Sequence, residues 1–228
     1  MKRKFKEVID LFNLKANIYE EWYSTKRGFL VLKTETRGID YFLPKHGLGI
    51  EIGAGTGIFS KLLTTKNRSI VCLDPSIRML RHAKNKGLQT ILGLAENPPI
   101  KDNCMDFVLI IASLEFINEP VKAFSSISSI LKRDGVLIVL IINKNGYWVR
   151  YYKSLGDKAP LLSKANFFSF SEITNLLRRG GFEILDALAT LVRYPDEISS
   201  ESFKLYRDYK KYDKAGVFII KAKRHKTS

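Results

Sequence analysis

Apolar runs of about the length of a β-strand alternate with helix-like segments from Leu48 to near the end of the chain. The expected strands lie near residues 48–53, 69–73, 89–93, 106–112, 135–142, 182–190 and 216–223. Apolar positions at helical spacing predict helices near residues 57–65, 76–86, 119–132 and 170–179. The run 135–142 has no polar alternate, which is typical of a strand buried on both faces. This order predicts an α/β fold with a doubly wound, mostly parallel, seven-stranded sheet that is Rossmann-like.

The first 46 residues follow a different pattern, because they are rich in helix formers and aromatic side chains. This stretch predicts two helices with a break near Thr25 to Gly28. We expect residues 1–46 to form a helical cap and residues 47–228 to form the main domain. An insertion near residues 145–170 is expected on the acceptor side of that domain, and its stretch at 147–170 is rich in aromatic side chains.

Composition adds little that is specific to this picture. The chain has 228 residues, of which 45% are hydrophobic, so it is long enough and apolar enough to bury a core. Its longest apolar runs are much shorter than the roughly 20 residues of a membrane-spanning helix, and its basic start lacks the apolar core of a signal peptide. We therefore expect a cytoplasmic protein with no membrane partner. Two cysteines and three scattered histidines predict free thiols and no metal site.

The net charge of +15 raises the question of a nucleic-acid partner. The excess of Lys and Arg is spread over residues 1–46, 47–146 and 147–228 alike, so no segment is a dedicated basic arm. Residues 203–214 do interleave Tyr206, Tyr209 and Tyr212 with basic side chains, a composition that could stack bases. Tyrosines three residues apart also pack along one helical face of a solvated connection, and we favour that interpretation.

A glycine-rich segment, "GIEIGAGTGIF" at residues 49–59, joins the first expected strand to the first expected helix of the sheet. In open α/β sheets, ligands bind beyond the carboxyl ends of the strands, where this turn lies. Gly53, Gly55 and Gly57 allow positive φ and let a ligand contact the main chain, although a tight turn without a ligand needs glycine too. A dinucleotide loop has a small third residue, whereas Ile58 stands there, and Glu51 favours a cationic ligand over a pyrophosphate. An oxidoreductase that uses NAD is therefore disfavoured.

Two further carboxylates follow the next expected strands. Asp74 comes twenty-one residues after Gly53, at the same edge of the sheet, where a carboxylate can accept hydrogen bonds from both hydroxyls of a ribose. A charge at a helix N-terminus is the alternative role for Asp74. Ala95 and Glu96 follow the third strand and could contact an adenine, although Glu96 taken alone is more typical of a solvated loop.

Together these motifs resemble the class I S-adenosylmethionine-dependent methyltransferases, and specifically their small ubiquinone-biosynthesis-like branch. The resemblance runs from about Tyr19 to Thr190 and rests on "IEIGAGTG", "LDPSIRML", "LAENPP" and "FFSFSEITNLLRRGGFEI". It implies S-adenosylmethionine as the cofactor and an antiparallel last strand. The usual Pro-Gly-Gly turn before the fifth strand is replaced by Arg133, Asp134 and Gly135, which we expect to form a structural turn.

The resemblance also implies a set of cofactor-binding residues. The acid near the methionine ammonium and the loop under the methionine moiety are Glu51, Gly53, Ala54, Gly55, Thr56 and Gly57. The residues around the ribose and the adenine are Asp74, Pro75, Ser76, Met79, Ala95 and Glu96. The residues after the fourth strand that line the pocket are Ser113 and Leu114. Tyr19 and Tyr23 of the cap are expected either to line the cofactor site or to pack in a core.

Methyl transfer from a sulfonium is an in-line displacement that depends mainly on positioning, so no catalytic residue is assigned. If the acceptor needs a general base, Glu115 and Tyr147 follow the fourth and fifth strands and are the candidates, although Glu115 is more typical of a helix-flanking charge. We expect a small-molecule acceptor, with a tRNA or rRNA methyltransferase as the alternative. A non-catalytic S-adenosylmethionine-binding regulatory protein is a further alternative, because binding and turnover are separable.

Overall fold

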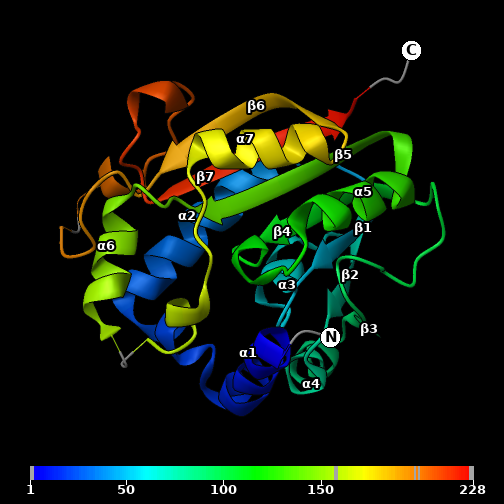
Figure 1. The fold of residues 1–228 in the computed structure, drawn as a ribbon, viewed down its shortest axis with the longest axis horizontal. Helices are drawn as coiled ribbons and strands as arrows, with labels where there is room; N and C mark the ends of the chain where they lie inside the picture. Colours follow the sequence, from blue (N-terminus) through cyan, green and yellow to red (C-terminus); the bar gives the residue numbers. More distant parts are fainter. Residues whose placement is uncertain (1–2, 157–158, 198, 200, 226–228) are drawn as a thin grey trace.

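The protein is a three-layer α/β structure built on a single seven-stranded sheet (Figure 1). The computed structural model describes residues 3–156, 159–197, 199 and 201–225. The strands are β1 (Gly47–Ile52), β2 (Arg68–Asp74), β3 (Gln89–Leu92), β4 (Met105–Ile111), β5 (Leu131–Ile142), β6 (Phe182–Thr190) and β7 (Val217–Arg224). Their spatial order is β3-β2-β1-β4-β5-β7-β6, and β7 is antiparallel to both of its neighbours. The predicted fold class and the antiparallel last strand are confirmed.

Helices cover both faces of the sheet. The α-helices are α1 (Arg3–Lys15), α2 (Lys26–Phe42), α3 (Ile58–Leu63), α4 (Ile77–Asn85), α5 (Pro120–Ile130), α6 (Tyr147–Ser154) and α7 (Phe170–Arg179). Short 3₁₀ turns are η1 (Ala16–Ile18), η2 (Glu21–Ser24), η3 (Leu114–Phe116), η5 (Leu162–Lys164), η6 (Glu201–Phe203) and η7 (Tyr209–Lys211). No helix among the described residues is long and apolar enough to cross a membrane.

The core divides into two main apolar clusters, one on each face of the sheet. Helices α5 and α7 contribute Phe124 and Leu177 to the first cluster, which packs on β1, β4, β5, β6 and β7. Helices α2 and α3 contribute Ile39 and Phe59 to the second cluster, on the opposite face. A third, smaller cluster joins α4 to β2 through Leu80 and Cys72. Both cysteines, Cys72 and Cys104, are free thiols, as predicted.

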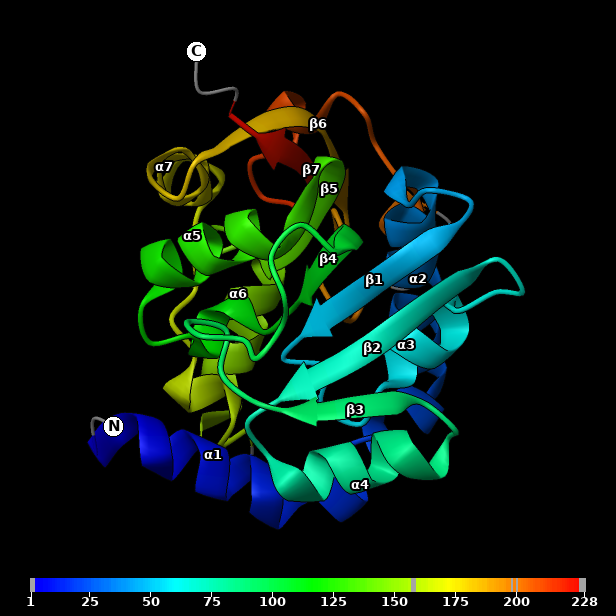
Figure 2. The same cartoon turned by 90° about the vertical axis from the view of Figure 1, so that its right-hand side faces the viewer.

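The chain order creates a crevice at the carboxyl edge of the sheet. Strand β1 pairs in parallel with β2 on one side and with β4 on the other, so the crossover helices leave this point in opposite directions. Ligands of doubly wound sheets bind where the strand order reverses in this way. Helix α1 lies beyond the carboxyl ends of these strands and contacts α4 (Figure 2).

The N-terminal segment is more broken than the sequence predicts. Helix α1 ends at Lys15 and α2 begins at Lys26, with η1 and η2 between them. The Thr25 hydroxyl caps α2 by accepting a hydrogen bond from the Gly28 amide at 3.0 Å. Because α2 packs on the sheet through its apolar face, it forms part of the main core. The division into a cap (1–46) and a domain (47–228) stays a prediction, and residues 1–2, 157–158, 198, 200 and 226–228 of those ranges lie outside the described residues.

One local prediction is wrong, and one helix was not predicted. The residues Arg133, Asp134 and Gly135 form no separate turn, because they lie within β5 at a register shift: Met105 pairs with Leu131, but Phe107 pairs with Val136. The extra residues on the β5 side form an irregularity of the sheet instead of a turn. The predicted insertion near 145–170 contains a helix, α6, whose Trp148 and Val149 are buried, and the sequence pattern did not reveal it.

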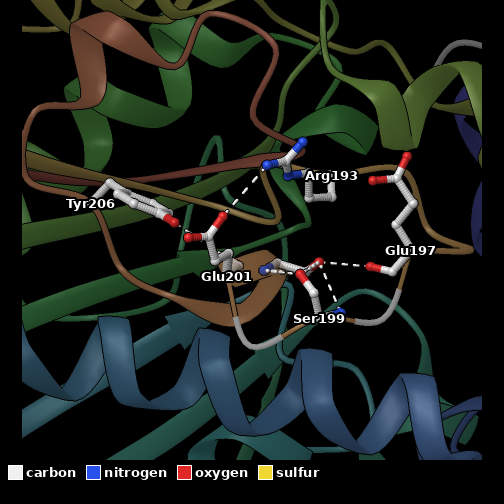
Figure 3. A network of polar contacts seen from close by, with 6 residues as sticks. Arg193, Glu197, Ser199, Glu201 and Tyr206 are labelled. Atoms are coloured by element: carbon white, nitrogen blue, oxygen red, sulfur yellow. Dashed lines mark hydrogen bonds and ion pairs between the residues drawn. The ribbon is translucent and has the colours of Figure 1, made fainter.

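The connection between β6 and β7 is an irregular loop and not the predicted helical face. Tyr206, Tyr209 and Tyr212 pack against the core, and Tyr206 forms a β-bridge with Ala189. Figure 3 shows how polar contacts hold this loop, with the Tyr206 hydroxyl donating to the Glu201 carbonyl at 3.2 Å. In the same network, Arg193 pairs with Glu201, and the Ser199 and Ser202 hydroxyls are 3.0 Å apart. The tyrosines are therefore part of a packed structure.

Candidate functional site

A cavity lies at the carboxyl ends of β1, β2 and β4, where the sheet topology predicts a ligand. We call it the first cavity. The glycine-rich loop after β1 forms its floor, the ends of β2 and β4 form its sides, and side chains of α1 and of the segment after it close it. The residues at its wall include both carboxylates, Glu51 and Asp74, which the sequence singles out, among mainly apolar neighbours.

Twelve of the sixteen predicted cofactor-binding residues line this cavity. They are Tyr19, Tyr23, Glu51, Gly53, Ala54, Gly55, Asp74, Pro75, Ser76, Ala95, Glu96 and Ser113. The other four lie behind its walls, and they are Thr56, Gly57, Met79 and Leu114. Segments that are distant in sequence therefore meet at one place, and the role of each residue in binding stays a prediction.

The loop after β1 has a conformation that requires glycine. Gly53, Gly55 and Gly57 have φ values of 70°, 55° and 73°, in the region that other residues rarely adopt. A Cβ atom added at Gly53 would lie 2.5 Å from the Ser113 side chain, and one at Gly57 would lie 2.6 Å from that of Leu88. A Cβ atom at Gly55 would meet nothing within 4 Å. Two of the glycines are thus required by packing, whereas Gly55 leaves the main chain accessible from the cavity.

Asp74 connects the glycine loop to the start of α4. Its Oδ2 accepts a hydrogen bond from the Gly55 amide at 2.8 Å, and its Oδ1 accepts one from the Ser76 amide at 2.7 Å. Burial raises the pKa of Asp74 to about 6, although both amides act to lower it. The side chain that caps α4 is that of Ser76, which accepts from the Met79 amide, and not that of Asp74. Asp74 therefore fixes the shape of the cavity and also presents a carboxylate to it.

Glu51 is the more deeply buried of these two acids, with 2% of its surface exposed. Its Oε2 accepts a hydrogen bond from the Ser60 hydroxyl. Burial raises the pKa of Glu51 to about 8, against the lowering effect of Ser60, and the nearby Asp74 raises it further. A cation entering the cavity would stabilise the ionised forms of both acids, so their burial favours a positively charged ligand.

Glu96 is also buried, so its interpretation as a solvated loop residue is wrong. Its Oε1 accepts hydrogen bonds from the amides of Asn118 and Glu119, at 3.2 and 3.1 Å, just before α5 begins. These bonds hold the loop after β3 against α5. Glu96 therefore lines the first cavity from a fixed position.

A second cavity, of about 450 Å³, adjoins the first. Its wall comes from α1, η2, the end of β5, α6 and the segment after α6, so it includes the aromatic insertion of the sequence. Five residues line both cavities, and they are Phe12, Tyr19, Tyr23, Ala112 and Phe116. The rings of Phe12 and Phe116 meet edge to face, with 5.0 Å between their centroids. Shared, largely aromatic side chains thus lie between the first cavity, of about 90 Å³, and the second, whose volume is in the range of ligand pockets.

Glu115, in η3, is buried and is among the residues that line the second cavity, so its interpretation as a helix-flanking charge is wrong. Its side chain is 2% exposed, and its Oε1 accepts a hydrogen bond from the Ile142 amide at 2.8 Å. Its Oε2 is buried and has no hydrogen-bond partner among the described residues. Burial raises the pKa of Glu115 to about 7. Tyr147, the other candidate base, lines neither cavity and stacks instead on Tyr194 at 4.4 Å.

Sequence reasoning missed one buried acid, Glu35, on α2. It is 6% exposed, and burial together with the charge of Glu115 raises its pKa to about 8. A signal existed in the sequence, because Glu35 stands four residues after Val31 and four before Ile39, on the apolar face of its helix. An acid at such a position is either paired or functional.

The described residues hold no cluster of His, Cys, Asp and Glu side chains that could bind a metal ion. The candidate chemistry of the site therefore comes from buried carboxyl groups, main-chain amides and aromatic rings. All three suit an organic cation with a sugar and a flat ring system.

Comparisons with known proteins agree with this geometry. A family model described as "Methyltransferase domain" matches residues 50–139. A crystal structure of a Thermotoga maritima protein, described as an S-adenosylmethionine-dependent methyltransferase and possible histamine N-methyltransferase, superposes with a TM-score of 0.83. The two chains are 31% identical, over 95% of this chain and 99% of the other.

Other relatives extend this result. The chain is 30% identical to uncharacterized protein MJ1123 of Methanocaldococcus jannaschii, over 86% of this chain and 92% of the relative. An S-adenosylmethionine-dependent methyltransferase of Aquifex aeolicus has the same fold, with a TM-score of 0.63 at 16% identity over 92% and 97% of the two chains. These comparisons support the class and not one branch of it, so the ubiquinone-biosynthesis-like branch stays a prediction.

The loop geometry generates a stability prediction. We expect Gly55→Ala to cost about 1–2 kcal/mol of unfolding free energy, the strain of a positive φ. Gly87→Ala, at another positive φ with no atom within 4 Å, should cost a similar amount. Gly53→Ala should cost clearly more, because its Cβ also collides with Ser113. Chemical denaturation measures all three, and equal losses at Gly53 and Gly55 would contradict this account of the loop.

Burial of Glu51 generates a pH prediction. Its pKa in the folded protein, about 8, lies above its ordinary value, so the stabilisation is complete at low pH and is lost as the pH rises towards 8. Glu51→Gln cannot ionise, so we expect it to be more stable than the parent at pH 9, by about 1 kcal/mol or more, but not at pH 5. Denaturation at pH 5, 7 and 9 measures the difference, with the exposed Glu197→Gln as a control for the loss of one acid. A pH-independent difference for Glu51→Gln would contradict the prediction.

Proposed function

Because the chain belongs to the class I S-adenosylmethionine-dependent methyltransferases, we propose that it transfers a methyl group to a small molecule bound in the second cavity. S-adenosylmethionine is its cofactor and supplies an activated methyl group on a sulfonium centre. The observation that carries the small-molecule proposal is the position of the second cavity, next to the first and separated from it by shared side chains.

The residues of the first cavity fit this cofactor chemically. Two buried carboxyl groups whose pKa values are raised, Glu51 and Asp74, suit the positive charges of an ammonium and a sulfonium. Gly55 leaves main-chain atoms open to contact, and Asp74, the last residue of β2, lines the cavity with a carboxyl group of the kind that accepts hydrogen bonds from hydroxyls. We assign Glu51 and the glycine loop to the methionine end, Asp74 to Ser76 to the ribose, and Ala95 with Glu96 to the adenine.

The N-terminal segment would close both cavities and exclude water. It is tied to α4 and its flanking residues by polar contacts that include Asn13 to the Ser76 hydroxyl at 2.8 Å, Asn17 to His82 at 3.1 Å, and Glu20 to Lys86 at 2.6 Å. Lys86 also donates to the Thr56 carbonyl of the glycine loop at 2.8 Å. A closed site of this kind holds two reactants in position, which is the main source of rate for a displacement that needs no covalent intermediate.

A small acceptor is favoured over RNA by the packing of the tyrosine-rich loop. Tyr206, Tyr209 and Tyr212 are packed against the core, so they do not form a platform on which bases stack. Basic residues of the same loop pair with neighbouring acids, as Arg207 does with Asp186. The description of the similar Thermotoga maritima protein as a possible histamine N-methyltransferase also supports a small acceptor.

A ligand-binding experiment tests the proposal. We expect S-adenosylhomocysteine, at a hundredfold excess over its dissociation constant, to stabilise the protein by about 2.7 kcal/mol, whereas NAD gives no stabilisation. Gly55→Ala should weaken this binding at least tenfold, since a methyl group would cover the accessible main chain, while Gly87→Ala should not. Thermal melts and calorimetry provide the measurements.

Stabilisation by NAD without a response to S-adenosylhomocysteine would overturn the assignment of the first cavity. The acceptor class is tested separately, by incubating the protein with labelled S-adenosylmethionine and either total RNA or pools of small molecules. We expect label in the small molecules, and RNA binding that is lost between 50 and 200 mM salt, as for nonspecific phosphate contacts. Saturable, salt-resistant methylation of one RNA would contradict the small-molecule proposal.

A further inference from the structure

The second cavity combines one buried acid with many aromatic rings. Seven of its lining residues are aromatic, and they are Phe12, Tyr19, Trp22, Tyr23, Phe116, Tyr151 and Tyr152. The charged residues among its described lining are Glu115, which is buried, and Lys15 of α1, which is partly exposed. Water screens the exposed charge of Lys15, so Glu115 dominates the interior electrostatically. Aromatic faces and a carboxylate together bind an organic cation.

We propose that the methyl acceptor is an amine with an apolar body, and that Glu115 receives the proton that its nitrogen must lose before methylation. This inference rests on the proposed function, because it names the occupant of the second cavity. It draws on the unpartnered, buried Oε2 of Glu115 and on the seven aromatic side chains that line the same cavity. The other oxygen of Glu115 is fixed by the Ile142 amide, so the carboxyl group is held in place.

Glu115 is also close in sequence to residues that form the wall between the two cavities. Ala112 and Phe116, which line both cavities, stand on either side of it in sequence, and Ser113 lines the first cavity. Residues 112–116, which end in η3, therefore contribute to both spaces within five positions. A nitrogen held at Glu115 would be on the acceptor side of that wall.

The titratable and charged groups around Glu115 come from several elements. Glu35 of α2 interacts with it electrostatically, and Tyr151 and Tyr152 of α6, Tyr19 and Tyr23 around η2, and Lys15 of α1 share the cavity with it. Burial raises the pKa of Tyr19 to about 12, and it raises the pKa values of Tyr23 and Tyr152 as well, so these hydroxyls stay neutral.

Arg27 is a cation near these rings, at 5.7 Å from the centre of the Tyr151 ring, but it pairs with Asp196 at 2.8 Å. Burial raises the pKa values of both neighbouring acids, Glu35 and Glu115, and Glu115 is the one that lines the cavity. When Glu115 is ionised, one monovalent cation in the cavity would balance its charge.

Proton transfer distinguishes an amine from a phenol or an alcohol. Burial raises the pKa of a carboxyl group and lowers that of an ammonium, so the two values approach each other inside the cavity. For a phenol, burial raises the pKa of the donor together with that of the acid, and the gap between them remains. The same low dielectric that perturbs Glu115 thus assists the deprotonation of an amine and gives no such help to a hydroxyl.

The reaction balances with these groups alone. The ammonium gives one proton to the carboxylate of Glu115, leaving a neutral amine and a neutral acid. The amine nitrogen then uses its lone pair to form the N–C bond to the methyl group, while the C–S bond breaks and its electron pair stays on sulfur. The positive charge passes from sulfur to nitrogen, where the aromatic rings stabilise it. The proton on Glu115 leaves to solvent when the site opens.

The test uses the full chain saturated with S-adenosylhomocysteine and matched pairs of probes, such as 2-phenylethylamine with 2-phenylethanol and further alkyl and aryl amines with their alcohols. At pH 8 we expect at least one amine to bind tenfold or more tightly than its alcohol. Glu115→Gln should reduce that ratio to below threefold without changing the affinity for the alcohol. Glu35→Gln removes an equally buried acid outside the cavity lining and should keep the preference for the amine.

A second measurement detects the proton that is released when the amine binds. Because the pKa of Glu115 is about 7 and a bound cation lowers it, amine binding at pH 7 should release a fraction of one proton. Calorimetry in two buffers of different ionisation enthalpy measures this release, which should be absent in Glu115→Gln.

With labelled S-adenosylmethionine, label should enter the amines, and Glu115→Gln should lower kcat by a hundredfold or more, as expected for the loss of a general base.

The outcomes separate the two proposals. If S-adenosylhomocysteine does not bind, the proposed function fails. If it binds but no amine is preferred over its alcohol, or if the preference survives in Glu115→Gln, the amine inference is overturned while the methyltransferase assignment stands. Label in phenols or carboxylates and not in amines would overturn it as well. If Glu115→Gln does not fold, Glu115→Asp and the amine-to-alcohol ratio of the parent protein decide the question.

Discussion

The burial of carboxyl groups at one edge of an apolar sheet is the constraint on which the site depends. Glu51, Asp74 and Glu96 line the first cavity, and Glu115 lines the second, all with little exposure to water. An isolated buried carboxylate is costly, so such groups either take up a proton or find a partner. Main-chain amides hold Asp74, Glu96 and one oxygen of Glu115, while burial raises the pKa values of Glu51, Asp74 and Glu115. A cationic ligand removes that cost, which makes affinity for cations a consequence of the fold.

The sheet topology explains why these acids meet. The order β3-β2-β1-β4-β5 puts the carboxyl ends of parallel strands side by side, so residues that follow different strands converge on one edge. The N-terminal segment completes the arrangement, because its aromatic side chains divide the space into two cavities. The donor and the acceptor of a methyl group would then occupy neighbouring chambers with the shared rings around the point of transfer. Stability and function compete at this site, since the carboxyl groups that would select the ligand are the groups whose ionised form is disfavoured by burial.

The strands and the first cavity could be predicted from the sequence, because both depend on residues that are near one another in the chain. Alternating apolar runs identified the strands, and the glycine pattern with Glu51 and Asp74 identified the first cavity, because such residues follow strands directly. Burial could not be predicted for Glu96 and Glu115, since it depends on elements far away in the chain, such as α5 and β5. The second cavity was equally inaccessible, because it forms only when α1 and α6 pack near each other. Glu35 was detectable in principle as an acid on an apolar helical face, but it was overlooked.

The central claim is that the first cavity binds the cofactor through its buried acids and its open main chain. A crystal structure of the protein with S-adenosylhomocysteine tests this claim most directly. The account predicts density for the ligand in the first cavity, with its amino group near Glu51, its ribose hydroxyls near Asp74, and main-chain contacts at Gly55. Density for the ligand at another place, with the first cavity still closed by Tyr19 and Tyr23, would contradict it.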